Sequence, residues 1–414
     1  MKSALQAGDW LKANRIASEH GSLWMIDPAD PKRSATNLYS GSSGVVLYFL
    51  ERYQLTGERE SREIALSGAD YLMATLPSRP QDVQAGLYTG ISGVGFVLLE
   101  TYRVSGEEKY LEGARLVLSL LEESARNVGK GVDWGPSTDI ISGSAGTGLF
   151  LLHAARELQS PSARRLAAQA GERLLELARP DQGGQKWAMR EDFPRLMPNF
   201  SHGTAGIAYF LAMLYKDTGQ REFLQGAIEG ARYLQAVART FGNGEACLIF
   251  HHEPEGEELF YLSWCHGPAG TARLFYLLHQ VSGEAEWMEW VRRLARGVRE
   301  SGIPEKQTPG YWNNVSQCCG AAGVAQFFLN LHQAAGRAED LSFARLMADA
   351  LLEKATVKDG QARWVQAEHR VRPELLQAQT GYMQGASGIG LMLFNLHRQQ
   401  SGLERGIVLP DNPF

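Results

Sequence analysis

A Gly-X-X-Gly segment followed at once by a long apolar run occurs seven times along the 414-residue chain. The first glycines of successive copies lie 49 to 65 residues apart, at Gly41, Gly90, Gly143, Gly203, Gly267, Gly320 and Gly385. A short unit repeated at such a period cannot bury its apolar face alone, so neighbouring units must stack. The sequence therefore predicts one large repetitive domain.

A second glycine marks the end of the apolar run in five of the copies. It lies 16 residues after the first glycine, which is typical of a helix C-terminal cap. These glycines are Gly57, Gly106, Gly219, Gly283 and Gly336. In the third copy this place is taken by Gln159, and in the seventh by Ser401 with Gly402 just after.

The apolar run and the segment after it predict two kinds of helix in each unit. The run is apolar nearly all round, which indicates an inner helix buried on most faces. The next segment has apolar residues at three- and four-residue spacing, which indicates an amphipathic outer helix. Inner helices with so little charge favour closure into a ring. We therefore expect an all-α fold, a single α/α toroid (barrel) of seven helical hairpins over residues 1–414, with inner and outer helix rings.

Three connections between the units are longer and carry aromatic, Pro or Gly residues. We expect them to be loop insertions around 129–141, 180–201 and 242–263. The last contains two apolar segments, 246–252 and 259–262, which predict a short hairpin between them. Long loops on one rim of a rigid scaffold commonly carry substrate contacts.

The composition is that of a soluble globular protein, with 44% hydrophobic and 21% charged residues. A net charge of −5 and the absence of a Lys/Arg run argue against a nucleic-acid surface. The N-terminal residues lack the apolar region of a signal peptide, and no apolar run is long enough to cross a membrane. We therefore expect a cytoplasmic protein with no transmembrane segment.

When the copies are aligned on the first glycine, reactive side chains occupy matching positions. Two residues before the glycine lie Cys265 and Cys318, and one residue before it lie His202, His266 and Cys319. In a toroid these positions point at one central cavity, where helix N-termini favour thiolates. Sites rich in thiolates select zinc, and three protein ligands leave a fourth position open. We therefore expect one zinc ion per chain, held by the three aligned cysteines.

A structural interpretation competes for each of these residues. A lone buried cysteine is more often inert, and we interpret Cys247, which lies outside the register, in that way. Three cysteines in matching register favour the metal instead. For His202 a functional role is favoured over a packing role, whereas His266 is balanced between the two.

Three short motifs carry a resemblance to a known family. They are Trp-Cys-His-Gly at 264–267, Cys-Cys-Gly at 318–320 and Ser-His-Gly at 201–203. Together with the seven Gly-X-X-Gly segments, they resemble the lanthionine synthetase C-like (LanC-like) family over essentially the whole chain.

The resemblance implies roles for individual residues. Members of the family typically ligate zinc through the cysteine of the Trp-Cys-X-Gly motif and both residues of a Cys-His-Gly motif. Cys319 stands where that histidine would be, a departure known among some related cyclases. The family's catalytic histidine matches His202, and its acidic residue matches Asp139. An arginine that some bacterial cyclases carry four residues before the first cysteine is Tyr261 here, so that part of the mechanism does not carry over.

The activity implied is that of a bacterial lanthipeptide cyclase, a zinc-dependent lanthionine synthetase. Cysteine thiols of a dehydrated precursor peptide add, as in a Michael addition, to dehydroalanine or dehydrobutyrine and form lanthionine or methyllanthionine thioether rings. The implied partners are this peptide and a separate dehydratase. We expect His202 to transfer the proton, with Asp139 orienting or charging it and His266 as a candidate partner.

Three rival functions follow from the same residues. LanC-like enzymes that add glutathione to dehydroamino acids in damaged proteins would use the same zinc-thiolate chemistry, and the sequence does not separate the two. A glycosidase on an α/α toroid needs paired carboxylates, and Asp139 is the one acid near the aligned positions, so this class is discounted. The third rival is a non-catalytic, zinc-stabilised peptide-binding protein.

Overall fold

The computed structural model describes all residues, 1–414, and they form two compact units. Unit 1 comprises Met1–Val83, Tyr88–Leu120 and Trp312–Leu409. Unit 2 comprises Gln84–Leu87, Leu121–Tyr311 and Pro410–Phe414. Both units are built from helices paired in the same way, as the repeats predict.

Seven helices begin directly after the first glycine of a repeat, as predicted, and their first turns are buried. They are α2 (Ser42–Thr56), α4 (Ile91–Ser105), α6 (Ser144–Glu157), α8 (Thr204–Thr218), α10 (Pro268–Ser282), α12 (Ala321–Ala335) and α14 (Ala386–Gln400). The second glycine of the motif is needed because the chain passes very close to it. A Cβ atom at Gly206 would lie 2.1 Å from the carbonyl oxygen of Phe200.

The predicted C-terminal caps are confirmed. All five cap glycines are left-handed, with φ between 70° and 74°. Gln159 takes the same region in the third copy, with φ of 51°, and Gly402 does so after the seventh, with φ of 66°. A left-handed residue ends a helix because it turns the chain away from the helix axis while satisfying late carbonyl groups.

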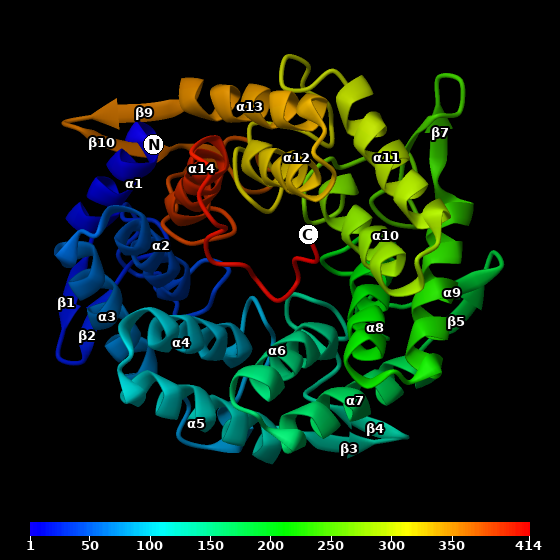
Figure 1. Cartoon of the computed structure of the whole chain (residues 1–414), viewed down its shortest axis with the longest axis horizontal. Helices are drawn as coiled ribbons and strands as arrows, with labels where there is room; N and C mark the ends of the chain where they lie inside the picture. The colour runs from blue at the N-terminus through cyan, green and yellow to red at the C-terminus, as the bar shows by residue number, and fades with distance from the viewer. The chain divides into compact units, whose positions relative to one another are not determined.

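Six outer helices follow the first six inner ones: α3 (Arg59–Ala74), α5 (Glu108–Ser124), α7 (Pro161–Glu176), α9 (Arg221–Val237), α11 (Ala285–Glu300) and α13 (Ala338–Glu353). Direct contacts join α2 with α3, α6 with α7, α8 with α9, α10 with α11, and α12 with α13 (Figure 1). The sequence therefore predicted both kinds of helix and their pairing.

The seventh hairpin uses both ends of the chain. No helix follows α14, and α1 (Lys2–Ala13) packs against it instead (Figure 1). Ala4, Ala7 and Leu11 of α1 are fully buried. In this hairpin the outer helix, α1, lies at the start of the sequence and the inner helix, α14, near its end. The repeat pattern did not reveal this order.

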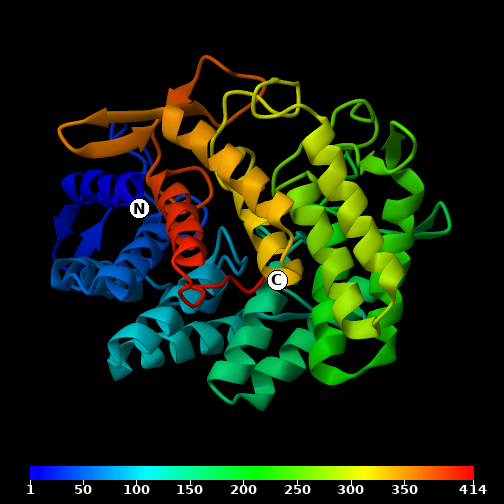
Figure 2. The ribbon, with the colours of Figure 1, turned by 45° about the horizontal axis from the view of Figure 1, so that its top comes forward.

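Inner helices also contact one another within each unit. In unit 1 the contacts run in the order α12, α14, α2 and α4, and in unit 2 in the order α6, α8 and α10. Figure 2 shows α14, in red, beside α12. Each unit therefore has a core of neighbouring inner helices.

Short antiparallel hairpins follow five of the outer helices and were not predicted. They are β1 (Ile16–Ser18) with β2 (Gly21–Leu23), β3 (Arg126–Val128) with β4 (Gly131–Asp133), β5 (Arg179–Asp181) with β6 (Gly184–Lys186), β7 (Arg239–Phe241) with β8 (Ala246–Leu248), and β9 (Ala355–Lys358) with β10 (Gln361–Trp364). The remaining short elements are the pair β11 (Gln366–Ala367) with β12 (Leu376–Gln377) and one 3-10 turn, η1 (Pro80–Asp82).

The hairpin predicted between segments 246–252 and 259–262 has a different partner. Strand β8 pairs with β7, which precedes it. Between the two predicted segments there is a hydrogen bond from the His251 N–H to the Leu259 carbonyl, at 2.7 Å, but no pair of strands. The prediction was wrong because the segment before β8, 239–241, lacks the apolar character used to find strands.

A tryptophan anchors four of the hairpins to the preceding outer helix. In each case the indole N–H donates to a carbonyl 13 residues earlier. The pairs are Trp24 with Leu11, Trp134 with Leu121, Trp187 with Leu174, and Trp364 with Leu351, at 2.7 to 2.9 Å. The bond gives the buried or half-buried indole N–H an acceptor, and it fixes each hairpin to a carbonyl in the last turn of the helix before it.

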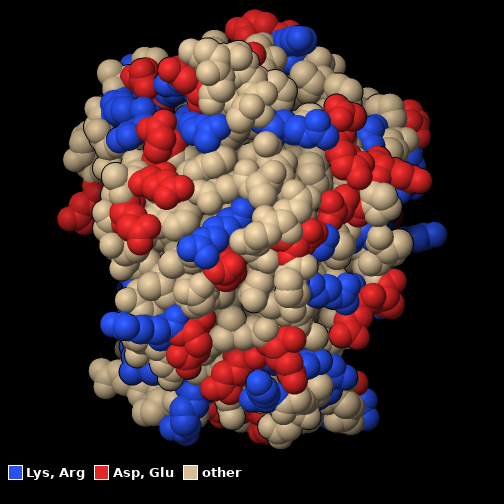
Figure 3. All heavy atoms as spheres, turned by 90° about the vertical axis from the view of Figure 1, so that its right-hand side faces the viewer, with Lys and Arg blue, Asp and Glu red and all other residues tan.

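Acidic and basic side chains are interspersed on the face shown in Figure 3, without a continuous basic area. This mixture agrees with the small net charge of −5. None of the helices combines the length and the apolar character needed to cross a membrane.

Candidate metal and catalytic site

Backbone hydrogen bonds join the residues that lie two before the first glycine in neighbouring repeats. In unit 1 they run from the N–H of Cys318 to Met383 at 3.0 Å, from Met383 to Tyr39 at 2.8 Å, and from Tyr39 to Tyr88 at 2.8 Å. In unit 2 the N–H of Ser201 donates to the carbonyl of Cys265 at 2.8 Å. Residues that the sequence alignment of the repeats places at the same position are therefore direct neighbours in the structure.

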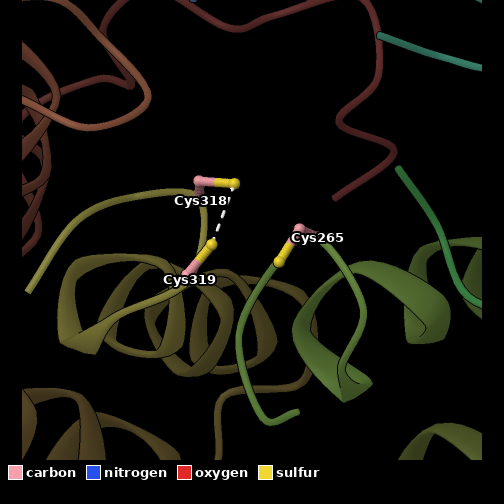
Figure 4. A group of neighbouring side chains, drawn as sticks. All are labelled: Cys265, Cys318 and Cys319. Atoms are coloured by element: carbon pink, nitrogen blue, oxygen red, sulfur yellow. Dashed lines mark hydrogen bonds between the residues drawn. The ribbon is translucent and has the colours of Figure 1, made fainter. Parts of the chain in front are cut away.

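Cys318 and Cys319 lie in unit 1, in the segment that leads into α12. Their sulfur atoms are 3.2 Å apart, as the dashed line in Figure 4 marks. Cys318 is buried and Cys319 is half-buried. The backbone N–H of Cys319 donates to the Ser316 hydroxyl at 3.2 Å, which helps to fix this turn. The N-terminus of α12 places partial positive charge beside these two sulfur atoms.

Side chains from two other repeats of unit 1 surround these sulfur atoms. The Tyr39 hydroxyl donates to Cys318 Sγ at 3.4 Å. The Gln384 amide donates to the Tyr39 oxygen at 3.0 Å and to Cys319 Sγ at 3.9 Å. Burial, and after it the neighbouring Cys318, raise the pKa of Tyr39 well above its usual range. The phenol therefore keeps its proton and acts as a donor.

Cys265 lies in unit 2, in the turn that leads into α10 (Figure 4). It is buried and makes no disulfide. The preceding Trp264 fixes the turn, because its indole N–H donates to buried Asp411 at 3.0 Å and its ring packs edge-on against Phe200. Cys318 and Cys319 offer two thiol donors for a metal ion in unit 1, and Cys265 offers one in unit 2. Thiol sulfur is the donor that zinc favours in such sets, so the residues fit zinc.

His202 and Asp139 are brought together in unit 2. His202 Nδ1 lies 2.5 Å from Asp139 Oδ2, so Nδ1 carries the proton that the carboxylate accepts. The Asp139 side chain is only 1% exposed, and its other oxygen accepts from the Ser142 N–H at 2.8 Å. The His202 side chain is 30% exposed. A fixed, buried carboxylate thus orients an accessible imidazole, the arrangement of a general acid or base.

His266 is more deeply placed than His202, and the centres of their rings are 5.7 Å apart. Its Nε2 lies 3.4 Å from the Ser201 hydroxyl, and its Nδ1 is buried without a hydrogen-bond partner. Burial, and then the nearby His251 and His202, lower the pKa of His266 well below its usual range. This imidazole is therefore neutral near pH 7.

His251, which sequence analysis had not singled out, also lies at this site, together with Tyr261, which was noted only as standing in place of an arginine. The His251 ring centre is 4.1 Å from that of His266 and 4.3 Å from that of Tyr261. Both residues belong to the 242–263 insertion, outside the aligned positions. The sequence signal for His251 was the unusual pair of adjacent histidines, His251 and His252, whose Nδ1 atoms are 2.6 Å apart.

Cys247 is fully buried in β8. Burial raises the pKa of its thiol to about 11, so it stays protonated and poorly reactive. This environment fits the structural role expected for Cys247.

A cavity of about 680 Å³ lies elsewhere in unit 2. Its wall includes Arg126, Arg173 and Arg179, and it reaches Thr138, next to Asp139. His202, His266 and Cys265 do not line it. The cavity is therefore a neighbour of the His202–Asp139 pair and not its enclosure.

Comparison with known proteins shows the family to which this chain belongs. Residues 34–406 match the sequence profile described as lanthionine synthetase C-like protein. The chain therefore belongs to the lanthionine synthetase C-like family.

The fold is similar to that of nisin cyclase, with a TM-score of 0.66 and 14% sequence identity over 95% of this chain and 92% of that one. This likeness confirms the expected α/α toroid class. An unsaturated glucuronyl hydrolase specific for heparin is also similar, with a TM-score of 0.52 and 11% identity over 97% of this chain and 96% of that one. So is an inactive variant of an α-1,6-mannanase of Salegentibacter sp., with a TM-score of 0.50 and 14% identity over 96% and 98%. Such likenesses show a shared fold, and function must be argued from the site.

Proposed function

We propose that this protein is a zinc-dependent lanthipeptide cyclase. Its substrate would be a dehydrated precursor peptide, and it would join cysteine thiols to dehydroalanine and dehydrobutyrine as thioether rings. The observation that carries the proposal is the hydrogen bond between His202 Nδ1 and buried Asp139, in the same unit as Cys265. Membership of the family supports the same reaction class.

Cys265, Cys318 and Cys319 are the proposed zinc ligands. Cys265 and Cys318 lie two residues before the first glycine of their repeats and Cys319 lies one residue before it, so each carries a thiol at the entrance of an inner helix. A bound zinc ion with an open position would lower the pKa of a substrate thiol, making it a nucleophile at neutral pH.

His202 is the proposed proton donor. Addition of the thiolate to the β-carbon forms the carbon–sulfur bond and moves the double-bond electrons toward the α-carbon and its carbonyl. A proton must then reach the α-carbon, while the thiol has already lost one, so the reaction consumes no proton overall. His202 is accessible, and Asp139 at 2.5 Å would stabilise its charged form and hold its orientation.

His266 has a different proposed role. It is buried and neutral, and its ring centre lies 5.7 Å from that of His202. We assign it to shaping the floor beside His202, with Tyr261 packed edge-on against it. A tyrosine cannot supply the permanent charge of the arginine that some cyclases carry at this place.

The fold is shared with glycoside-cleaving enzymes, but the site argues against that chemistry. A glycosidase needs two carboxyl groups flanking the scissile bond. Asp139 instead makes its hydrogen bonds to the His202 ring and to the Ser142 backbone. The groups gathered at the helix entrances are thiols and imidazoles, which suit thiol addition.

The test is a cyclisation assay with the purified, zinc-loaded protein. A dehydrated, cysteine-containing peptide is incubated with and without protein, and the loss of free thiol is followed by alkylation and mass spectrometry. We expect ring formation well above the uncatalysed background. A parallel reaction supplies glutathione and a dehydrated peptide without cysteine; faster addition in this reaction alone would assign glutathione transfer instead. If neither reaction is accelerated, the protein binds peptide or zinc without catalysis.

A further inference from the structure

Two hydrogen-bond donors reach the adjacent sulfur atoms of unit 1, and the proposed function gives neither a role. The Tyr39 hydroxyl lies 3.4 Å from Cys318 Sγ, and the Gln384 amide nitrogen lies 3.9 Å from Cys319 Sγ. They come from the first and seventh repeats, whereas the cysteines belong to the sixth. The donors and sulfur atoms are brought together by the fold, since about 280 residues separate Tyr39 from Cys318.

The orientation of the Gln384 amide is determined by its neighbours. Its oxygen accepts from the side-chain amides of Asn314 and Gln366, each at 3.4 Å. Its nitrogen donates to the Tyr39 oxygen at 3.0 Å. Asn314, Gln366 and Gln384 are all at most 2% exposed. Because the oxygen is occupied by two donors, the N–H groups must be the ones that face Tyr39 and Cys319.

The negative charge of two adjacent thiolates explains why hydrogen-bond donors are needed beside them. Two neighbouring thiolates repel each other, and a buried negative charge is costly unless hydrogen bonds satisfy it. A histidine at position 319 would be a neutral ligand. Cys319 as a thiolate therefore gives the site one more negative charge than a histidine would. Hydrogen bonds to an ionised group are roughly twice as strong as those between neutral groups.

We propose that Tyr39 and Gln384 are positioning residues that donate hydrogen bonds to the thiolates of Cys318 and Cys319 and so stabilise a site with an additional cysteine ligand. The inference rests on the proposed zinc site. It goes beyond that site because it gives Tyr39 and Gln384 a role: their hydrogen bonds lower the free-energy cost of two adjacent thiolate ligands. Asn314 and Gln366 hold the Gln384 amide in the orientation that this role requires.

The direct test measures the affinity for zinc and not the activity. Zinc dissociation constants are obtained by competition with a chromogenic chelator for the wild type, Tyr39→Phe and Gln384→Leu. Each variant is expected to bind zinc about 10- to 100-fold more weakly, the usual effect of removing an outer partner of a metal ligand. The double variant should be weaker than either single variant.

Tyr48→Phe is the matched control in the same unit. Its hydroxyl is fully buried and donates to the carbonyl of Ala4, far along the chain from the cysteines. Removing it costs a buried hydrogen bond without changing any group near sulfur. Its zinc affinity should stay within about twofold of the wild type, so a general loss of stability is separated from the effect at the thiolates.

Cobalt provides a spectroscopic readout. In Co²⁺-substituted protein, thiolate-to-metal charge-transfer absorption in the near ultraviolet reports on the electrons of the sulfur ligands. Loss of a hydrogen bond to sulfur should shift this band to lower energy in Tyr39→Phe, and Tyr48→Phe should leave it unchanged. If the wild type binds no metal, the zinc site itself is wrong. If it binds metal and both the affinity and the band are the same in Tyr39→Phe and Gln384→Leu, the donor role is wrong.

Discussion

The backbone N–H of Met383 donates to the carbonyl oxygen of Tyr39 at 2.8 Å, joining the seventh repeat directly to the first. The residues lie at the same place in their repeats, two before the first glycine. The same kind of bond joins Cys318 to Met383. Residues at equivalent places in two repeats are therefore direct neighbours even when most of the chain separates them in sequence. This explains how Tyr39, in the first repeat, reaches Cys318, in the sixth.

His202→Ala should slow cyclisation of a dehydrated peptide by about 10²- to 10⁴-fold while the zinc content stays at the wild-type level, because a positioned general acid contributes this range. Initial rates and metal analysis on the same preparation check it. A deficit below tenfold would mean that another group or solvent supplies the proton.

Asp139→Asn should also lower the rate with zinc retained, by about 10²-fold. The amide keeps nearly the shape of the carboxylate, but it has no charge to stabilise a protonated His202, which Asp139 contacts at 2.5 Å. Single-turnover rates at saturating peptide are the appropriate measurement. An unchanged rate would show that orientation alone, which asparagine preserves, is sufficient.

Cys318→Ala should remove bound zinc together with activity, since two thiolates hold zinc much less firmly than three. Cys247→Ala is the matched control, because it removes a buried thiol that lies outside the ligand group. It should retain one zinc per chain, measured by inductively coupled plasma mass spectrometry after dialysis. Full zinc content in Cys318→Ala would refute the ligand assignment.

Trp187→Phe should destabilise the protein by about 2 kcal/mol, through loss of a buried hydrogen bond and of side-chain volume. The Trp187 indole donates to the Leu174 carbonyl at 2.7 Å and is fully buried. Trp290→Phe, at a half-buried position stacked on Phe275, should cost less. Urea unfolding compares the two. Equal losses would mean that the bond to Leu174 contributes nothing of its own.

The sequence by itself determined the helices and the aligned positions of the candidate site. Gly41 and Gly57 show the reason, because the first begins an inner helix and the second ends it through local backbone conformation. The same local signal at each repeat places Cys265 and Cys318 at equivalent points. Such features can be predicted from the sequence because they depend on residues that are at most one helix length apart in the chain.

Only the tertiary structure decided what lies beside those positions. The partner of α14 is α1, at the other end of the chain, and His251 contacts His266 from an insertion without any repeat pattern. Tyr39 meets Cys318 because packing of inner helices brings distant repeats together. These contacts depend on the packing of apolar surfaces far apart in the sequence, and apolar burial is not directional, so no local pattern of residues specifies which surfaces meet.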